Sequence, residues 1–214
     1  MIGSTKLISL GFLFIGIFFL MQVMMPLISF QIWNFGQSYN SRSLMSPLGY
    51  DNKNILGVSI QNNDNFSAFV SSLSRESKAP YSQFYISIPK IKIDNALVKV
   101  DSNDLSNSLA HLPGSALPGE KGNVFVSGHS ALSSLFNMKN AVFANLLGLQ
   151  KGDQIIVDAA GIKFTYQVIE FKVIDSKDLS VILPPDSIGR YISLMTCVPP
   201  GLNFKRLVIL GKML

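Results

Sequence analysis

Apolar residues are most concentrated near the start of the chain, where they fill residues 7–30 with Gln22 as the main polar exception. A helix of about 20 apolar residues covers the roughly 30 Å of a bilayer's hydrocarbon core, so this run predicts a transmembrane helix. Its length, and the lack of an Ala-x-Ala-like site after it, favour an anchor over a cleaved signal peptide. Trp33 follows, a residue type enriched at membrane interfaces. We therefore assign residues 1–33 to a membrane anchor, with Lys6 on the cytoplasmic side.

Polar residues dominate the next segment, residues 34–80, which is rich in Ser, Asn, Gly and Gln. Apolar residues follow no clear period there, which is typical of a linker rather than of a packed element. The segment is predicted to be a polar stalk with at most one short helix, near residues 66–73. Given the orientation of the anchor, the stalk and everything after it face the outside of the cell.

Short runs of β-branched and aromatic residues begin at Tyr81 and alternate with turns that contain Gly and Pro. Evenly spaced short strands are typical of a closed barrel or a sandwich, so residues 81–214 are predicted to form one mainly β domain. Two short helices are expected to interrupt it, near residues 103–110 and 142–149. The predicted strands are residues 84–88, 96–100, 123–127, 154–157, 164–174, 191–197 and 206–210.

Charge and cysteine content limit the kinds of site that the chain can hold. The 214 residues carry a formal net charge of +5 and include a single cysteine, Cys197. One cysteine excludes a disulfide within the chain and a multi-cysteine zinc site, and no metal site is predicted. The lysines are scattered, so no nucleic-acid-binding surface is indicated. A modest positive charge suits anionic lipid or wall polymers, and it is equally typical of ordinary solubility.

Cys197 stands at the end of the predicted strand 191–197, because Val198-Pro199-Pro200-Gly201 cannot continue a strand. A strand end fixes a side chain on the scaffold and leaves it open to a substrate, which suits a nucleophile. Cys197 is therefore the candidate nucleophile. An isolated cysteine is also often a small buried hydrophobic residue, and that alternative stays open.

A thiol nucleophile needs a proton acceptor, since the thiolate is the form that attacks. The chain has two histidines, His111 and His129. His129 follows the predicted strand 123–127 and Gly128, which is expected to let the chain turn or let a substrate approach closely. His111 lies in a loop before that strand. Position favours His129 as the acceptor, and a purely structural histidine is the alternative.

A cation is the third part that such a site needs, because attack on an amide creates an oxyanion that a fixed donor stabilises. The β-rich region holds two arginines, Arg190 and Arg206. An odd separation from Cys197 would place Arg190 on the opposite face of a regular strand. Arg206 opens the next predicted strand, and a hairpin would bring it beside Cys197. The pattern predicts a Cys–His–Arg site that acts on an acyl group, and a solvated arginine at a strand end is the alternative.

Several segments around these residues match one known family together. They are Leu194-Met195-Thr196-Cys197, Arg206-Leu207-Val208, Gly128-His129-Ser130, residues 111–123, Gly152-Asp153-Gln154-Ile155 and Ile86-Ser87-Ile88-Pro89-Lys90. Over about residues 81–214 the chain resembles the sortases, which are cysteine transpeptidases of the cell surface.

The resemblance implies an eight-stranded β-barrel with Cys197 as nucleophile, His129 as general acid and base, and Arg206 as stabiliser of the substrate or the oxyanion. It places His111 outside the catalytic set. It implies that the substrates are secreted proteins with an LPxTG-like C-terminal sorting signal. A wall precursor or a lysine amine would be the acceptor. No cofactor is predicted, since some sortases use calcium but no calcium ligands are assigned on this sequence.

Two other classes of protein remain as alternatives. An inactive, membrane-anchored β-barrel that binds wall or protein ligands would share the fold and the stalk, although it would not need all three site residues. The L,D-transpeptidases carry Ser-His-Gly-Cys, with histidine two residues before cysteine. Here Leu194-Met195-Thr196 precede Cys197, which disfavours them.

Overall fold

A computed structural model describes residues 4–38, 58–63, 66–71, 78–130, 141–200 and 204–214. The chain divides into two compact units, residues 1–42 and residues 43–214. The first unit contains α1 (Ser4–Ser38), a single helix of 35 residues. The second contains all the strands.

The α1 helix exposes large apolar side chains along its length. Phe12, Phe14 and Phe18 are 72%, 62% and 59% exposed. Within the described residues, no helix combines the length and the apolar character that crossing a membrane requires. The membrane anchor over residues 1–33 therefore stays a prediction from the sequence.

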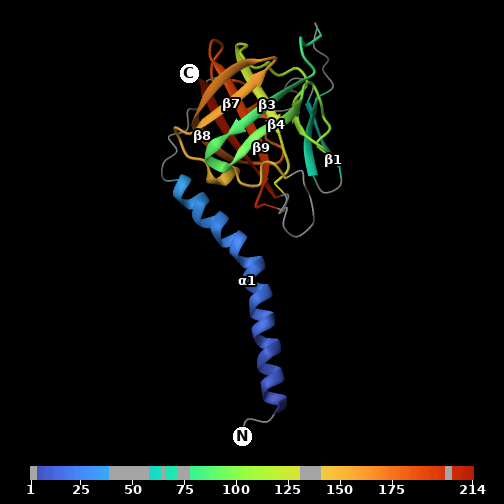
Figure 1. Cartoon of the computed structure of the whole chain (residues 1–214), viewed down its shortest axis with the longest axis vertical. Coiled ribbons are helices and arrows are strands. Elements are labelled where there is room, and N and C mark those ends of the chain that lie inside the picture. The colour runs from blue at the N-terminus through green and yellow to red at the C-terminus, as the bar shows by residue number, and fades with distance from the viewer. Residues whose placement is uncertain (1–3, 39–57, 64–65, 72–77, 131–140, 201–203) are drawn as a thin grey trace. The chain divides into compact units, whose positions relative to one another are not determined.

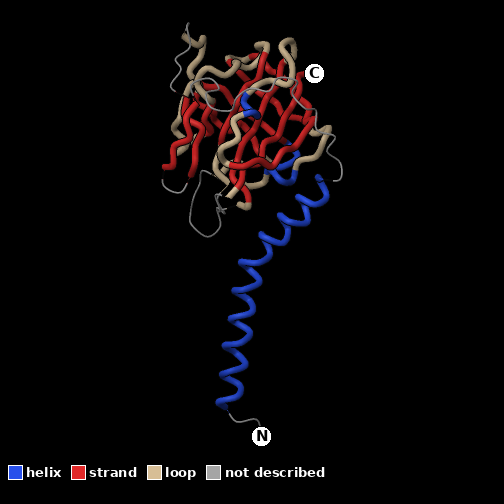
Figure 2. Tube along the Cα trace, turned by 180° about the vertical axis from the view of Figure 1, so that it is seen from behind, coloured by secondary structure: helices blue, strands red, loops and turns tan. Residues whose placement is uncertain are grey.

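Eight strands of the second unit close into a barrel in the order β10-β8-β7-β3-β4-β5-β6-β9, with β9 pairing back to β10 (Figures 1 and 2). The pairs β4–β5 and β6–β9 are parallel, and the other pairs are antiparallel. The predicted eight-stranded barrel is thus confirmed. Its strands are β3 (Gln83–Ile88), β4 (Ile93–Lys99), β5 (Leu109–His111), β6 (Gly122–Ser127), β7 (Gln154–Ala159), β8 (Ile162–Asp175), β9 (Arg190–Val198) and β10 (Lys205–Met213).

The two helices predicted inside this domain are wrong as helices. Residues 103–110 contain no helix and lead into β5, which pairs with β4 on one side and with β6 on the other. Residues 142–149 form turns and one 3-10 turn, η2 (Leu146–Gly148). Barrel closure through β5 overrides the local preference of a short segment. The other 3-10 turns are η1 (Pro89–Ile91) and η3 (Ser180–Ile182).

An antiparallel hairpin, β1 (Val58–Asn63) and β2 (Phe66–Ser71), forms a separate two-stranded sheet. It lies in the segment that was predicted to be a polar stalk, and the short helix expected near residues 66–73 is wrong. Val58 and Phe69 are buried against the barrel, and this packing favours strand over helix. Of the rest of the predicted stalk, residues 34–38 belong to the end of α1. Residues 39–57, 64–65 and 72–77 lie outside the described residues.

Each of the paired strands β9 and β10 has one face toward the barrel interior and one face outward. A Cβ atom on Gly211 would meet Ile192, Tyr166 and Ile155 from three strands, which marks that face as the interior. Alternation then turns Met195 and Val208 outward. On the outer side they belong to a second buried cluster, which contains Val58, Phe69, Leu112, Phe125, Ile174, Leu179, Val181, Ile182, Met195 and Val208. We call this set the outer cluster.

Candidate active site

Cys197 and Arg206 lie directly opposite one another on the neighbouring strands β9 and β10. The hairpin predicted from the sequence therefore brings them together as expected. Cys197 is two residues after Met195 and Arg206 is two residues before Val208, so both belong to the outward face. They are closely covered there, since Cys197 is 5% exposed and Arg206 is 0% exposed. One guanidinium nitrogen, Nη1, donates a hydrogen bond to the carbonyl oxygen of Lys205 at 3.1 Å.

His129 follows β6, which pairs in parallel with β9 on the other side of Cys197. The last pair in this register joins Ser127 to Met195, so two residues further along each strand lead to His129 and Cys197. Two hydrogen bonds hold this extension. The Gly128 amide donates to the Met195 carbonyl at 3.0 Å, and the Thr196 hydroxyl donates to the Gly128 carbonyl at 2.8 Å. The three predicted residues thus come from the ends of three adjacent strands, with Cys197 on the middle one.

Burial sets the protonation of this site. It raises the pKa of the Cys197 thiol to about 11, and the positive charge of Arg206 opposes that rise. Burial lowers the pKa of the half-buried His129. It also lowers the pKa of Arg206, which the negative charge of a Cys197 thiolate would raise. At neutral pH the thiol and the imidazole are therefore both uncharged, and the guanidinium supplies the positive charge.

Packing leaves no room for a side chain at Gly128. A Cβ atom at this position would lie 2.5 Å from Leu109 Cδ2 and 2.6 Å from Phe143 Cδ2. Both of those side chains are almost fully buried. The Phe143 amide also donates to the His129 carbonyl at 3.1 Å. Phe143 is a supporting residue that sequence reasoning missed, because it lies in an irregular segment with no motif of its own.

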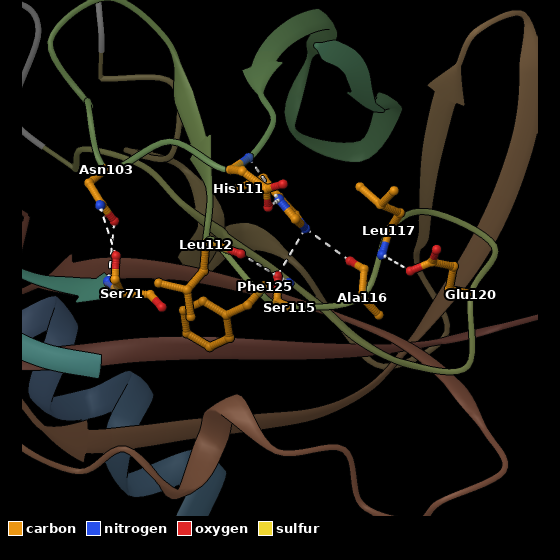
Figure 3. Close-up of polar contacts among 10 residues, drawn as sticks. Ser71, Asn103, His111, Leu112, Ser115, Ala116, Leu117, Glu120 and Phe125 are labelled. Atoms are coloured by element: carbon orange, nitrogen blue, oxygen red, sulfur yellow. Dashed lines mark hydrogen bonds and ion pairs between the residues drawn. The ribbon is translucent and has the colours of Figure 1, made fainter. Parts of the chain in front are cut away.

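His111 is the last residue of β5 and not a loop residue as predicted, and its ring is fully buried (Figure 3). Its Nδ1 accepts the Asp101 amide at 3.2 Å. Its Nε2 lies 2.9 Å from both the Ala116 carbonyl oxygen and the Ser115 hydroxyl. The Ser115 hydroxyl also accepts the Phe125 amide of β6 at 3.3 Å. Both ring nitrogens thus contact polar groups of the segments on either side of β5, at Asp101, Ser115 and Ala116.

Arg190 opens β9, seven positions before Cys197, and so lies toward the other end of that strand. Its Nε donates a hydrogen bond of 2.7 Å to the carbonyl oxygen of Gly119. Gly119 also donates its amide to the Tyr166 hydroxyl at 3.2 Å. Arg190 thus holds the loop that contains Gly119 and lies apart from Cys197. Arg206, in contrast, is the strand partner of Cys197.

Across the ranges that the structure describes, no three His, Cys, Asp or Glu side chains come together in a way that could hold a metal ion.

Comparison with known proteins assigns the barrel to one family. The model of the Sortase domain matches residues 86–214. Sortase D of Bacillus subtilis (strain 168) is 32% identical over 131 residues, which cover 59% of this chain and 61% of that protein. The chain thus spans about three fifths of the length of this curated relative.

Solved structures agree with the sequence comparison. A lid mutant of Sortase A from Corynebacterium diphtheriae is similar with a TM-score of 0.55 and 29% identity, over 65% of this chain and 73% of that one. A Sortase D5 transpeptidase from Clostridium perfringens is similar with a TM-score of 0.53 and 27% identity, over 65% of this chain and 82% of that one. The matched domain covers more than half of the chain and contains all eight barrel strands but the start of β3, and the chain therefore belongs to the sortase family of cysteine transpeptidases.

Proposed function

We propose that this chain cleaves an LPxTG-like sorting signal in secreted proteins and transfers the acyl fragment to an amine through a thioester on Cys197. Such a reaction would serve the anchoring of surface proteins or the assembly of pili. The observation that carries the proposal is the order of the three strand ends, in which Cys197 lies between the end of β6 that leads to His129 and the start of β10 with Arg206.

Acylation begins with the Cys197 thiol and the His129 imidazole both uncharged. His129 takes the proton of the Cys197 thiol as the sulfur attacks the carbonyl carbon before the cleaved bond, and the carbonyl electrons move to the oxygen. The positive charge of Arg206 stabilises the resulting oxyanion, and burial strengthens this electrostatic interaction. When the oxyanion collapses, the carbon–nitrogen bond breaks and His129 gives its proton to the leaving amine. A thioester and a free amine result.

Transfer repeats the same steps with a new amine. The acceptor amine attacks the thioester carbonyl, His129 removes a proton from it, and Arg206 again stabilises the oxyanion. The carbon–sulfur bond then breaks, and the Cys197 sulfur takes the proton from His129. An amide is formed and the thiol is restored. Water in place of the amine would give simple hydrolysis.

The test uses the full-length chain in detergent micelles with a set of LPxTG-like peptides and amines, followed by mass spectrometry. We expect ligated peptide, and an acyl adduct on the proteolytic fragment that contains Cys197. The adduct should be absent from the Cys197→Ala variant. Failure to form either product or adduct, with the Cys197 thiol intact, would overturn the proposal in favour of an inactive binding module.

The rate at which iodoacetamide alkylates Cys197 is expected to rise about tenfold for each pH unit between about pH 7 and about pH 10. The thiolate is the reactive form, and burial raises the pKa of this thiol to about 11, so the thiolate fraction keeps growing across this range. The alkylated fraction is measured by mass spectrometry while circular dichroism confirms that the barrel stays folded. A rate that levels off below about pH 8 would show instead a thiolate already present at neutral pH.

Replacing Thr196 by valine is expected to lower kcat/KM about tenfold. The exchange keeps the shape of the side chain but leaves the Gly128 carbonyl without the 2.8 Å hydrogen bond that holds the segment before His129. Ser193→Ala is the matched control, because Ser193 is also buried on β9 and its hydroxyl has no hydrogen-bond partner among the described residues. Equal activity of the two variants would contradict the role given to Thr196.

We further propose that α1 attaches the chain to the cell membrane and that the barrel acts outside the cytoplasm. Support comes from the exposed apolar side chains of α1, since large exposed apolar surfaces mark membrane or protein contacts. Cell fractionation should place the full chain with the membranes, and the double variant Phe14→Arg, Phe18→Arg should shift part of it to the soluble fraction. A wild-type chain in the soluble fraction would refute the attachment.

A further inference from the structure

Residues 176–189 join β8 to β9, and we call them the β8–β9 connection. They contribute to the outer cluster together with Met195 and Val208, which lie two positions from Cys197 and from Arg206 on the same face. The connection thus forms part of the surface beside the site. Its buried apolar side chains are Leu179, Val181 and Ile182.

Asn123 of β6 holds the middle of this connection. Its Nδ2 donates two hydrogen bonds, to the carbonyl oxygen of Val181 at 3.2 Å and to that of Ile182 at 3.0 Å. Asn123 is only 3% exposed, and its Oδ1 has no hydrogen-bond partner among the described residues. Burial of an amide costs free energy unless hydrogen bonds offset it. At Asn123 the two bonds to the connection supply that offset.

Tyr191 holds the end of the connection, from the strand position directly opposite Asn123. Its hydroxyl donates to Asp186 Oδ2 at 2.5 Å, and Asp186 Oδ1 accepts the amides of Ile188 and Gly189. Burial raises the pKa of Tyr191 to about 12, so the hydroxyl keeps the proton that it donates. A Cβ atom on Gly189 would collide with the Tyr191 ring, which shows how closely the ring packs against the connection.

Asn123 and Tyr191 are far from the reacting atoms. Tyr191 is six residues before Cys197, which corresponds to about 20 Å along β9. The even separation puts both on the outward face, and Asn123 shares that face with Phe125 of the outer cluster. These two residues therefore act on the site only through the connection that they hold.

The polar bonds supply what apolar packing alone lacks. Burial of apolar side chains is not directional, so it leaves a segment free to slide over the surface that it covers. Hydrogen bonds from two neighbouring strand residues fix the connection at two points, at Val181 and Ile182 and again at Asp186. Its apolar side chains then keep one position relative to Met195 and Val208.

We propose that Asn123 and Tyr191 are positioning residues, which hold the β8–β9 connection as a fixed surface for the apolar part of the peptide substrate. This inference rests on the proposed function for the substrate, whereas the anchoring itself does not depend on it. A surface that is ordered before the peptide arrives loses little entropy when the peptide binds. Looser anchoring would weaken binding and leave the chemical step intact, because barrel strands hold Cys197 and Arg206.

The test compares Asn123→Leu and Tyr191→Phe with wild type in the full-length chain. Leucine keeps the branched shape of asparagine without its donors, and phenylalanine keeps the ring without the hydroxyl. Hydrogen exchange is followed at the Ile182 amide, which donates to the Leu179 carbonyl at 3.1 Å within the connection. Exchange there should be about tenfold faster in Asn123→Leu and about threefold faster in Tyr191→Phe, with β9 and β10 unchanged.

The controls make the same exchanges at exposed side chains. Asn107→Leu removes a hydrogen bond to the neighbouring Ser106, and Tyr85→Phe removes one from Gln83. Neither residue contacts the connection through these bonds, so exchange at Ile182 should match wild type in both. Wild-type exchange in both Asn123→Leu and Tyr191→Phe, or equally fast exchange in the controls, would overturn the inference.

Peptide kinetics test the role in binding. KM should rise about tenfold for Asn123→Leu and about threefold for Tyr191→Phe at unchanged kcat, since the lost interactions bind the substrate rather than the transition state. The preference between peptides that differ in an apolar residue before the cleaved bond should fall by similar factors, about tenfold and about threefold. Faster exchange with an unchanged KM would overturn the inference. Faster exchange in the variants, with no peptide product from wild type, would support the anchoring and refute the proposed transpeptidase function.

Discussion

Replacing Arg206 by methionine is expected to lower kcat/KM by about 10²–10³-fold, the usual loss when one stabiliser of an oxyanion is removed. Methionine keeps most of the volume of the buried stem but not its charge. Arg206 lies opposite Cys197 in the register of β9 and β10, and no part of it reaches solvent. Its charge therefore acts on the developing oxyanion with little screening by water. Steady-state kinetics of peptide ligation provide the measurement.

Stability separates this effect from damage to the fold. Exchange of a buried charge for an apolar side chain of similar volume is often neutral or stabilising, so the melting temperature of Arg206→Met should not fall with the activity. The pKa of Cys197 should rise further, because Arg206 now lowers it. Arg190→Met is the control, since Arg190 binds the Gly119 carbonyl toward the other end of β9. Full activity of Arg206→Met would remove this residue from the mechanism.

Replacing Gly128 by alanine is expected to lower both stability and activity. The new Cβ atom would lie 2.5 Å from Leu109 and 2.6 Å from Phe143, too close for any ordinary contact. Overpacking of this kind costs about 1–3 kcal/mol of folding free energy. Relief of the clash would also move the next residue, His129, and a shift of about 1 Å at a catalytic group is able to cost about 10²-fold in rate. Thermal melting and ligation kinetics measure the two effects.

A second substitution tests the cause. Phe143→Leu makes room beside position 128, so the double variant should recover part of the stability and activity that Gly128→Ala loses. Gly148→Ala is the matched control, because its Cβ atom would meet only Ile91, at 3.3 Å. That variant should lose much less. Equal losses at positions 128 and 148 would show that the crowding at Gly128 is not the cause.

The sequence is sufficient to predict seven of the eight barrel strands, all but β5, and the pairing of Cys197 with Arg206. Alternating β-branched runs and turn residues mark most of the barrel strands, and a short loop between two strands brings their facing ends together. The predicted strand that ends at Cys197 also agrees with β9, which Arg190 opens. These features depend on local periodicity, which a single sequence displays.

The missed features depend on contacts between distant segments. The β1–β2 hairpin lies in a polar stretch of the sequence with few apolar residues. Their role is evident only from their packing in one cluster with Phe125 and Met195 of the barrel. Residues 103–110 were expected to be helical, but their end completes the barrel as β5. The need for glycine at position 128 could not be predicted either, since the crowding side chains of Leu109 and Phe143 are 19 and 15 positions away in the sequence.

The parallel pairing of β6 with β9 has a consequence for the newly made protein. Thr196 and Gly128, which lock this pairing, are 68 positions apart, and β10 comes after both strands in the chain. Contacts of such long sequence separation form late in folding. A chain whose β10 has not yet been made would thus hold Cys197 and His129 without Arg206. The three side chains can therefore come together only after the last strand of the barrel has been added.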